Sequence, residues 1–291
     1  MDLSKVTIII PSYKRQEYAI NALKYWSKYD VNLHLLDGSD DPILNIDKEI
    51  NNPRINYHHI KILSEVERIK KILPLIKTKY TILSSDDDLL LPNALSNCLE
   101  EIEKDEDIIS CYGQTLSFYN INKELKFFRT DVDLKNFSNN SVMPIKRLKY
   151  HMLNYVPSII YSVMLTKFFI NIFDTNNFNK YKYHAAMEFR ASLLINYYGR
   201  SKVTENLIVL RNKDTSSATK KNLSKTSFFR TLYYSKNQKI DFINDLVFSV
   251  RKIIKDQDAF YLNKIFNASL KYYLFFIIKI FFKKKLNLII T

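Results

Sequence analysis

Residues 80–92 read Tyr-Thr-Ile-Leu-Ser-Ser-Asp-Asp-Asp-Leu-Leu-Leu-Pro. Residues 80–83 predict a buried strand, and Pro92 is typical of the first turn of a following helix. The carboxylates of Asp86, Asp87 and Asp88 therefore follow the carboxyl end of a strand, where open α/β sheets bind their ligands. Adjacent carboxylates repel one another unless a cation or a hydrogen-bonded ligand offsets their charge. The alternative is an acidic helix start that the helix dipole stabilises.

Strands and helices alternate on both sides of this stretch. The expected strands are 6–10, 32–36, 54–60, 80–83 and 107–119, and the expected helices are 17–28, 63–77 and 92–104. The second strand ends in another polar turn, Asp37-Gly38-Ser39, and residues 121–150 indicate a long loop or insertion. This order predicts an α/β fold with a mostly parallel sheet flanked by helices.

The composition excludes several classes of protein. The chain has 291 residues, of which 46% are hydrophobic, as is ordinary for a globular protein. Its 3 glycines are too few for a Gly-x-Gly-x-x-Gly dinucleotide turn or a Gly-rich phosphate loop. Two cysteines, Cys98 and Cys111, build neither a disulfide framework nor a zinc ribbon. Because the N-terminus also shows no signal-peptide pattern, we expect a cytoplasmic protein.

The formal net charge is +14. Such a charge is expected of a solvated basic surface. It is also expected of a surface that binds anionic lipid, a nucleotide diphosphate or nucleic acid. The sequence contains no zinc finger, no aromatic RNP-type motif and no convincing helix-turn-helix, so we expect no nucleic-acid partner.

Three motifs occur in order along the chain. They are Val-Thr-Ile-Ile-Ile-Pro-Ser-Tyr-Lys-Arg at 6–15, Leu-Asp-Gly-Ser-Asp at 36–40, and the stretch 80–92. Together they resemble the family-2 glycosyltransferases of GT-A fold, well over residues 5–100 and more loosely over 155–215. The resemblance implies a Rossmann-like GT-A fold and a nucleotide-diphosphate sugar as donor. It also implies a glycan or lipid-linked acceptor in bacterial surface polysaccharide assembly.

The resemblance assigns residues to the donor side. The first-strand turn that borders the nucleotide base in the family is matched by Pro11, Ser12 and Tyr13, and Arg15 closes the same motif. Asp37 matches the carboxylate that accepts from the N3–H of the base, which suits uridine, so a UDP-sugar is expected. An Asx turn with Gly38 is the other role for Asp37, and the two roles are compatible.

The same resemblance places a divalent cation, Mn²⁺ or Mg²⁺, at the acidic cluster. Asp87 matches the family's metal-binding aspartate and Asp88 the aspartate that follows it, while Asp86 matches a position that contacts the donor. Ser85 stands where the family has the first Asp of its Asp-x-Asp motif, so the ion has one protein carboxylate fewer.

Basic residues are expected near the diphosphate. Arg68 is the nearest match to the family's position before the strand, with Lys70 and Lys71 as competitors. A solvated helix face is the alternative for all three. Arg211 lies where family members have a loop near the diphosphate.

The acceptor side follows later in the chain. Residues 184–198 predict a helix that Gly199 caps at its C-terminus. Glu188 on this helix matches the general base of inverting family members, or else stabilises the first turn of the helix. His184 lies four residues earlier and could face the same cleft, although a satisfied surface or core histidine is the alternative. Residues 155–164, with Ser162, resemble the floor of the acceptor site.

The C-terminal part differs in character. We expect a glycosyltransferase domain over 1–215 and a helical extension over 216–291, with the apolar and lysine-rich residues 270–290 contacting a membrane surface. Packing on the catalytic domain or a dimer contact would explain the same segment, and the oligomeric state stays open. The protein would then be peripheral on the inner face of the cytoplasmic membrane.

Two other functions compete with a glycosyltransferase. A sugar-phosphate nucleotidyltransferase shares the general sheet design, but the first motif lacks the Gly-rich signature that usually opens such enzymes. A non-catalytic membrane scaffold with a degenerate site gains support from Ser85.

Overall fold

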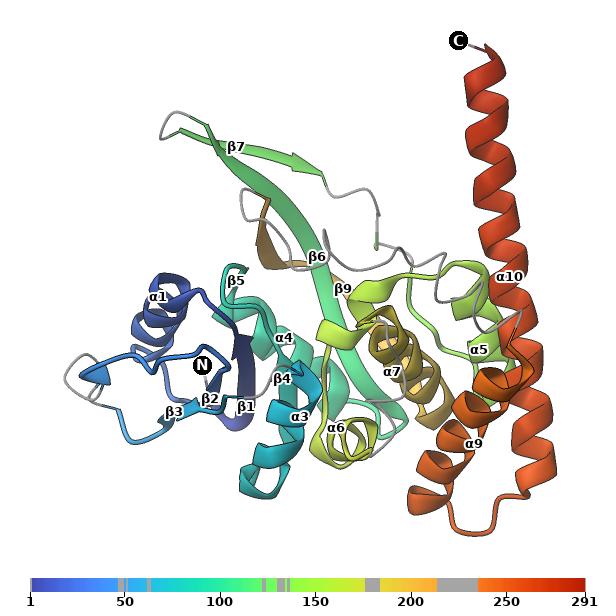
Figure 1. Ribbon diagram of the computed structural model, residues 1–291, viewed down its shortest axis with the longest axis horizontal. Helices are drawn as coiled ribbons and strands as arrows, with labels where there is room; N and C mark the ends of the chain where they lie inside the picture. The colour runs from blue at the N-terminus through green and yellow to red at the C-terminus, as the bar shows by residue number, and fades with distance from the viewer. Residues whose placement is uncertain are drawn as a thin grey trace. The chain divides into compact units, whose positions relative to one another are not determined.

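The computed structural model describes residues 2–46, 50, 52–61, 64–121, 124–129, 134, 137–175, 184–213 and 235–290 (Figure 1). The chain divides into two compact units. Unit 1 comprises Met1–Ser138, Tyr161–Asp174 and Ser201–Ser216, and unit 2 comprises Asn139–Ile160, Thr175–Arg200 and Ser217–Thr291. The expected boundary at 215/216 lies outside the described residues.

Unit 1 is built on one sheet, whose first four strands are parallel. They are β1 (Leu3–Ser12), β2 (Val31–Asp37), β3 (Ile55–His59) and β4 (Tyr80–Leu83), in the order β3-β2-β1-β4. Runs such as Ile8-Ile9-Ile10 are fully buried because helices cover this part of the sheet, as continuous apolar strands require. The register pairs Ser12 with Asp37, so the ends of the first two motifs lie side by side.

The sheet continues beyond β4 with antiparallel pairings. The further strands are β5 (Leu89–Leu90), β6 (Ile108–Ile121), β7 (Glu124–Arg129), β8 (Val163–Leu165) and β9 (Arg200–Asn212). In the described chain the sheet order is β3-β2-β1-β4-β8-β6-β9-β5, with β7 paired to β6. The predicted α/β sheet is therefore present, and antiparallel strands complete it on one side.

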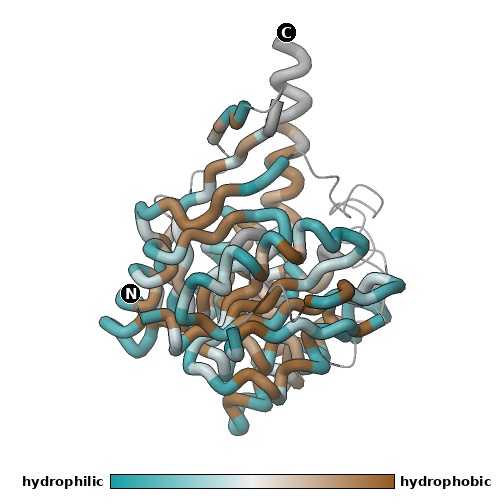
Figure 2. Tube along the Cα trace, turned by 90° about the vertical axis from the view of Figure 1, so that its left-hand side faces the viewer, coloured by the Kyte–Doolittle hydropathy of each residue, from teal (hydrophilic) through white to brown (hydrophobic). Residues whose placement is uncertain are grey.

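Helices pack on the sheet of unit 1. They are α1 (Gln16–Trp26), α3 (Glu65–Ile72), α4 (Pro92–Glu103) and α6 (Thr166–Phe173), with a 3-10 turn at Leu73–Leu75 after α3. Figure 2 shows hydrophobic and hydrophilic stretches interleaved along the described chain. The three helices expected before residue 105 are present, with α3 shorter than predicted because Pro74 ends its regular turn.

Unit 2 is helical. Its helices are α5 (Pro144–Leu153), α7 (His184–Tyr198), α9 (Lys236–Ile253) and α10 (Ala259–Ile290), and a 3-10 turn at Pro157–Tyr161 joins it to unit 1. The expectation of a loop over 121–150 is wrong in part, since it contains β7 and most of α5. Gly199 follows α7 as predicted, but no glycine in the described chain has a positive φ, so the left-handed cap is absent.

Candidate functional site

The carboxyl end of β2 holds Asp37 in a fixed orientation. Its side chain is 1% exposed. Oδ1 accepts the backbone N–H of Ser39 at 2.8 Å, which forms an Asx turn around Gly38. Oδ2 accepts the hydroxyl of Tyr57, on the neighbouring strand β3, at 2.7 Å. No sequence motif pointed to Tyr57, because its role depends on the pairing of β2 with β3.

Arg68 lies against the same turn. A Cβ atom at Gly38 would be 1.8 Å from Nη1 of Arg68, so the glycine makes room for the guanidinium. The side chain is 3% exposed. Burial lowers the pKa of Arg68, and the charges of Glu65 and Asp37 act in the opposite direction. The competitor Lys70 is directed to Asp174 instead, with its Nζ 3.6 Å from Oδ1.

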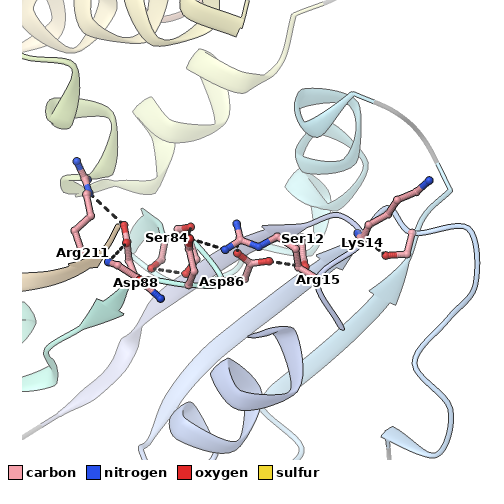
Figure 3. A network of polar contacts seen from close by, with 11 residues as sticks. Ser12, Lys14, Arg15, Ser84, Asp86, Asp88 and Arg211 are labelled. Atoms are coloured by element: carbon pink, nitrogen blue, oxygen red, sulfur yellow. Dashed lines mark hydrogen bonds and ion pairs between the residues drawn. The ribbon is translucent and has the colours of Figure 1, made fainter. Parts of the chain in front are cut away.

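The turn after β1 has an unusual backbone. Lys14 has a φ of 55°, in the left-handed region that non-glycine residues rarely adopt. Its N–H donates to Ser39 Oγ at 2.9 Å (Figure 3). Its Nζ lies 3.0 Å from Asp40, so two contacts connect the first two motifs. Tyr13 beside it is exposed.

The turn after β1 also contacts the acidic cluster after β4. Ser12 Oγ donates to Asp86 Oδ2 at 2.7 Å, and Arg15 Nη1 lies 3.1 Å from Asp86 Oδ1 (Figure 3). The other guanidinium nitrogen, Nη2, lies 2.5 Å from Asp87 Oδ2, and Ser85 donates to the second oxygen of Asp87. Burial raises the pKa of Asp86 to about 6, although Ser12 and Arg15 oppose the shift.

Asp88 is directed away from this network. It accepts the backbone N–H of Asn212 at 3.1 Å and pairs with Arg211 Nε at 3.4 Å, at the end of β9 (Figure 3). The Arg211 guanidinium lies 6.0 Å from the centre of the Tyr161 ring. Burial raises the pKa of Asp88 to about 6, and the charge of Arg211 acts against this.

The three aspartates therefore do not converge on one point. Among the described residues, no group of three or more His, Cys, Asp or Glu side chains is arranged to hold a metal ion. Mg²⁺-like ions commonly take only one or two protein carboxylates and draw their other ligands from water and substrate phosphates. A site with Asp87, which follows β4, as its protein carboxylate agrees with that rule. A site built entirely from protein side chains does not agree with the positions of the three aspartates.

The predicted acceptor-side residues are divided between the units. Ser162 is buried in unit 1, directly before β8. Glu188 lies on α7 in unit 2 and is half-buried. Burial, and next the charge of Glu188, raises the pKa of both Tyr155 and Tyr273, which places these hydroxyls near its carboxylate. The side chain of His184 lies outside the described residues.

Comparison with known proteins reveals similar solved structures. Residues 1–349 of S. aureus TarS in complex with UDP-GlcNAc match with a TM-score of 0.58 and 12% identity, over 93% of this chain and 73% of that one. A structure of S. aureus TarS matches with a TM-score of 0.50 and 13% identity, over 92% of this chain and 54% of the other. No family model and no curated protein matches the chain. At this identity the likeness concerns the fold, which is therefore the GT-A-like α/β fold that the three sequence motifs predicted.

Proposed function

We propose that the chain is a glycosyltransferase that uses a UDP-sugar as donor. The observation that carries the proposal is the assembly of Asp37, Arg68, Arg15 and Asp86 at the carboxyl ends of adjacent parallel strands. Ligands bind at this edge of open α/β sheets. The fold is shared with TarS, whose structure contains UDP-GlcNAc.

Asp37 suits the recognition of uracil. The Ser39 amide and the Tyr57 hydroxyl each use one lone pair of a different carboxylate oxygen, so both oxygens can accept a further hydrogen bond. Uracil offers a single N3–H donor. The N3 of cytosine carries no hydrogen, and guanine would have to fit a second ring beside the same carboxylate. The exposed Tyr13 ring at the adjoining turn would supply a face for the base.

The diphosphate would lie near the basic side chains of Arg15, Arg68 and Arg211. Asp87 would hold a Mn²⁺ or Mg²⁺ ion that also takes phosphate oxygens as ligands. Asp88, the other proposed ligand, would have to turn from Arg211 and Asn212 to reach the same ion. When bound, such an ion offsets negative charge on the leaving diphosphate. The guanidinium of Arg15 already provides positive charge at Asp86 and Asp87.

Glu188 is proposed as the general base. An acceptor hydroxyl oxygen would form the bond to C1 of the sugar as the bond from C1 to the diphosphate oxygen breaks. The hydroxyl proton passes to the Glu188 carboxylate, and attack opposite the leaving group inverts C1. Ser162 and His184 are proposed on the acceptor side. The acceptor would be a glycan or a lipid-linked sugar of bacterial surface polysaccharide, reached in the cytoplasm or at the inner face of the cytoplasmic membrane.

A non-catalytic scaffold is the second candidate. The contacts of the Asp87 carboxylate with Ser85 and Arg15 favour it. In a degenerate site these protein partners would take the place of a metal ion.

Thermal unfolding with a panel of nucleotides separates the two candidates. We expect UDP and at least one UDP-sugar, with Mn²⁺, to raise the Tm, while GDP and CMP do not. Asp87→Asn should reduce the Mn²⁺-dependent part of the shift, and Asp30→Asn, at an exposed aspartate of the same unit, should leave it unchanged. Tm values that are the same for every nucleotide would favour the scaffold.

A further inference from the structure

The outward face of α10 is apolar and basic. The side that packs within unit 2 carries Leu262, Phe266 and Tyr273, all buried. The opposite side carries Phe275 and Phe282, which are 62% and 59% exposed, with Ile278 between them. Their spacing of three and four residues places them on one stripe of the helix. An outward helix face of a globular protein is ordinarily polar, so an exposed apolar stripe of this kind marks an interaction surface.

The helix also extends beyond its packing partners. Ile280 follows Tyr273 by seven residues and therefore lies on the same side of the helix, yet it is 38% exposed. In Figure 1, α10 continues past α5 and α9 toward the C-terminus. From Phe275 to Phe282 the described part of α10 thus presents apolar side chains around much of its circumference.

The charge of this segment has one sign. Residues 259–291 contain six lysines and no aspartate or glutamate. Lys271 and Lys279 lie four residues before and four residues after Phe275, and therefore on the outward side of the helix beside the stripe. A net charge of +14 for the whole chain adds a long-range attraction to anionic surfaces.

Helix α5 adds a second stripe to the same surface. Its outward positions carry Lys149, Tyr150 and Leu153, all exposed. The Nζ of Lys149 lies 5.4 Å from the centre of the Tyr272 ring, so this stripe borders α10. We call the outward side chains of Lys149, Tyr150, Leu153, Phe275, Lys279 and Phe282 the α5–α10 face.

We propose that the α5–α10 face binds the surface of a membrane that contains anionic lipid. Aromatic rings are favoured at headgroup depth, and each lysine near an anionic surface strengthens binding about fivefold. Within the ranges that the structure describes, no helix has the length and apolarity needed to cross a bilayer. The helix would therefore lie in the interface. The inference stands on unit 2 alone and does not depend on the donor.

Vesicle flotation of the full chain tests the proposal. We expect flotation with vesicles of phosphatidylcholine plus phosphatidylglycerol, weaker binding with phosphatidylcholine alone, and release at high salt. The double variant Phe275→Ser/Phe282→Ser should lower the partition coefficient about tenfold or more, because two phenyl groups no longer enter the lipid. The matched control is Phe248→Ser on α9, whose phenylalanine is 59% exposed and has Lys252 over its ring.

Three results would overturn the proposal. The first is a native chain that stays at the bottom of the gradient with anionic vesicles, and the second is a double variant that floats as well as the control. The third is a native chain that is a dimer by light scattering, becomes a monomer in the double variant and binds no vesicles, which would assign the face to a second copy. An unchanged unfolding temperature shows that the variants remain folded, and nucleotide-induced Tm shifts report on the donor site separately.

Discussion

At the scale of single residues, the Arg68 guanidinium fills the space that a side chain at Gly38 would need in the candidate donor site. A methyl group at position 38 would lie 1.8 Å from Nη1 and 2.6 Å from Cζ of a guanidinium that is itself buried. Gly38→Ala must therefore displace Arg68 or the turn that holds Asp37. We expect a loss of about 1–3 kcal/mol in the free energy of unfolding, together with weaker binding of UDP by calorimetry.

A double-mutant cycle isolates this coupling. In an Arg68→Ala background the added methyl group finds space, so Gly38→Ala should cost clearly less there than in the native chain. Equal costs in the two backgrounds would show that the steric conflict does not involve Arg68.

At the scale of elements, one buried ion pair joins α7 to α9. Arg190 Nε lies 2.5 Å from Asp245 Oδ2, Thr175 Oγ1 donates to Asp245 Oδ1 at 2.9 Å, and the Arg190 side chain is fully buried. Asp245→Ala leaves an uncompensated buried charge, so we expect a loss of about 3–5 kcal/mol in chemical denaturation. Asp30→Ala, which breaks the exposed pair with Arg54, should cost about 1 kcal/mol or less. The prediction fails if the two variants unfold at similar denaturant concentrations.

The pairing of β2 with β3 predicts a pH dependence of stability. His34 Nδ1 and His58 Nε2 are 2.8 Å apart. Burial, and next the charge of His58, lowers the pKa of His34 to about 4. The unfolded chain therefore binds more protons than the folded chain between pH 6.5 and 4. The contribution of neutral His34 to the free energy of unfolding is therefore fully present above pH ~6.5 and is lost as the pH falls toward 4.

His34→Asn should remove this dependence. Between pH 7 and pH 4 we expect the free energy of unfolding to fall less in the variant than in the native chain, by on the order of 2–3 kcal/mol. Asp86 and Asp88, with pKa values of about 6, act in the opposite sense, so the difference between native and variant curves is the quantity to measure. Parallel curves would contradict the assignment to His34.

At the scale of the whole molecule, the sequence predicts the elements that a local pattern defines, and it misses elements that depend on pairing with distant strands. The strand at 80–83 and the helix at 184–198 are predicted with their observed bounds, because each is a continuous pattern with a clear end. Strands β5 and β8 escape prediction because two or three residues carry no periodicity and depend on partners far along the chain.

The site shows the same division. The three motifs identify Asp37 and the acidic cluster from residues close in sequence. They do not reveal that Arg15 bridges Asp86 and Asp87, or that Tyr57 holds Asp37, because those contacts depend on strand register. Tyr273 near Glu188 likewise follows only from the packing of helices within unit 2, 85 residues apart in the sequence.

The division into two units predicts that donor binding and transfer can be separated. Asp37, Arg68 and the acidic cluster belong to unit 1, whereas Glu188 belongs to unit 2. Glu188→Gln keeps the shape of the side chain but cannot accept the acceptor's proton, so kcat should fall about 10²–10⁴-fold. The UDP dissociation constant from calorimetry should stay unchanged, and Glu188→Asp should recover part of the rate.

The native product should have the opposite anomeric configuration to the donor. Retention at C1, or a Glu188→Gln variant with native turnover, would remove Glu188 from the role of base, while a parallel loss of UDP binding would place Glu188 on the donor side.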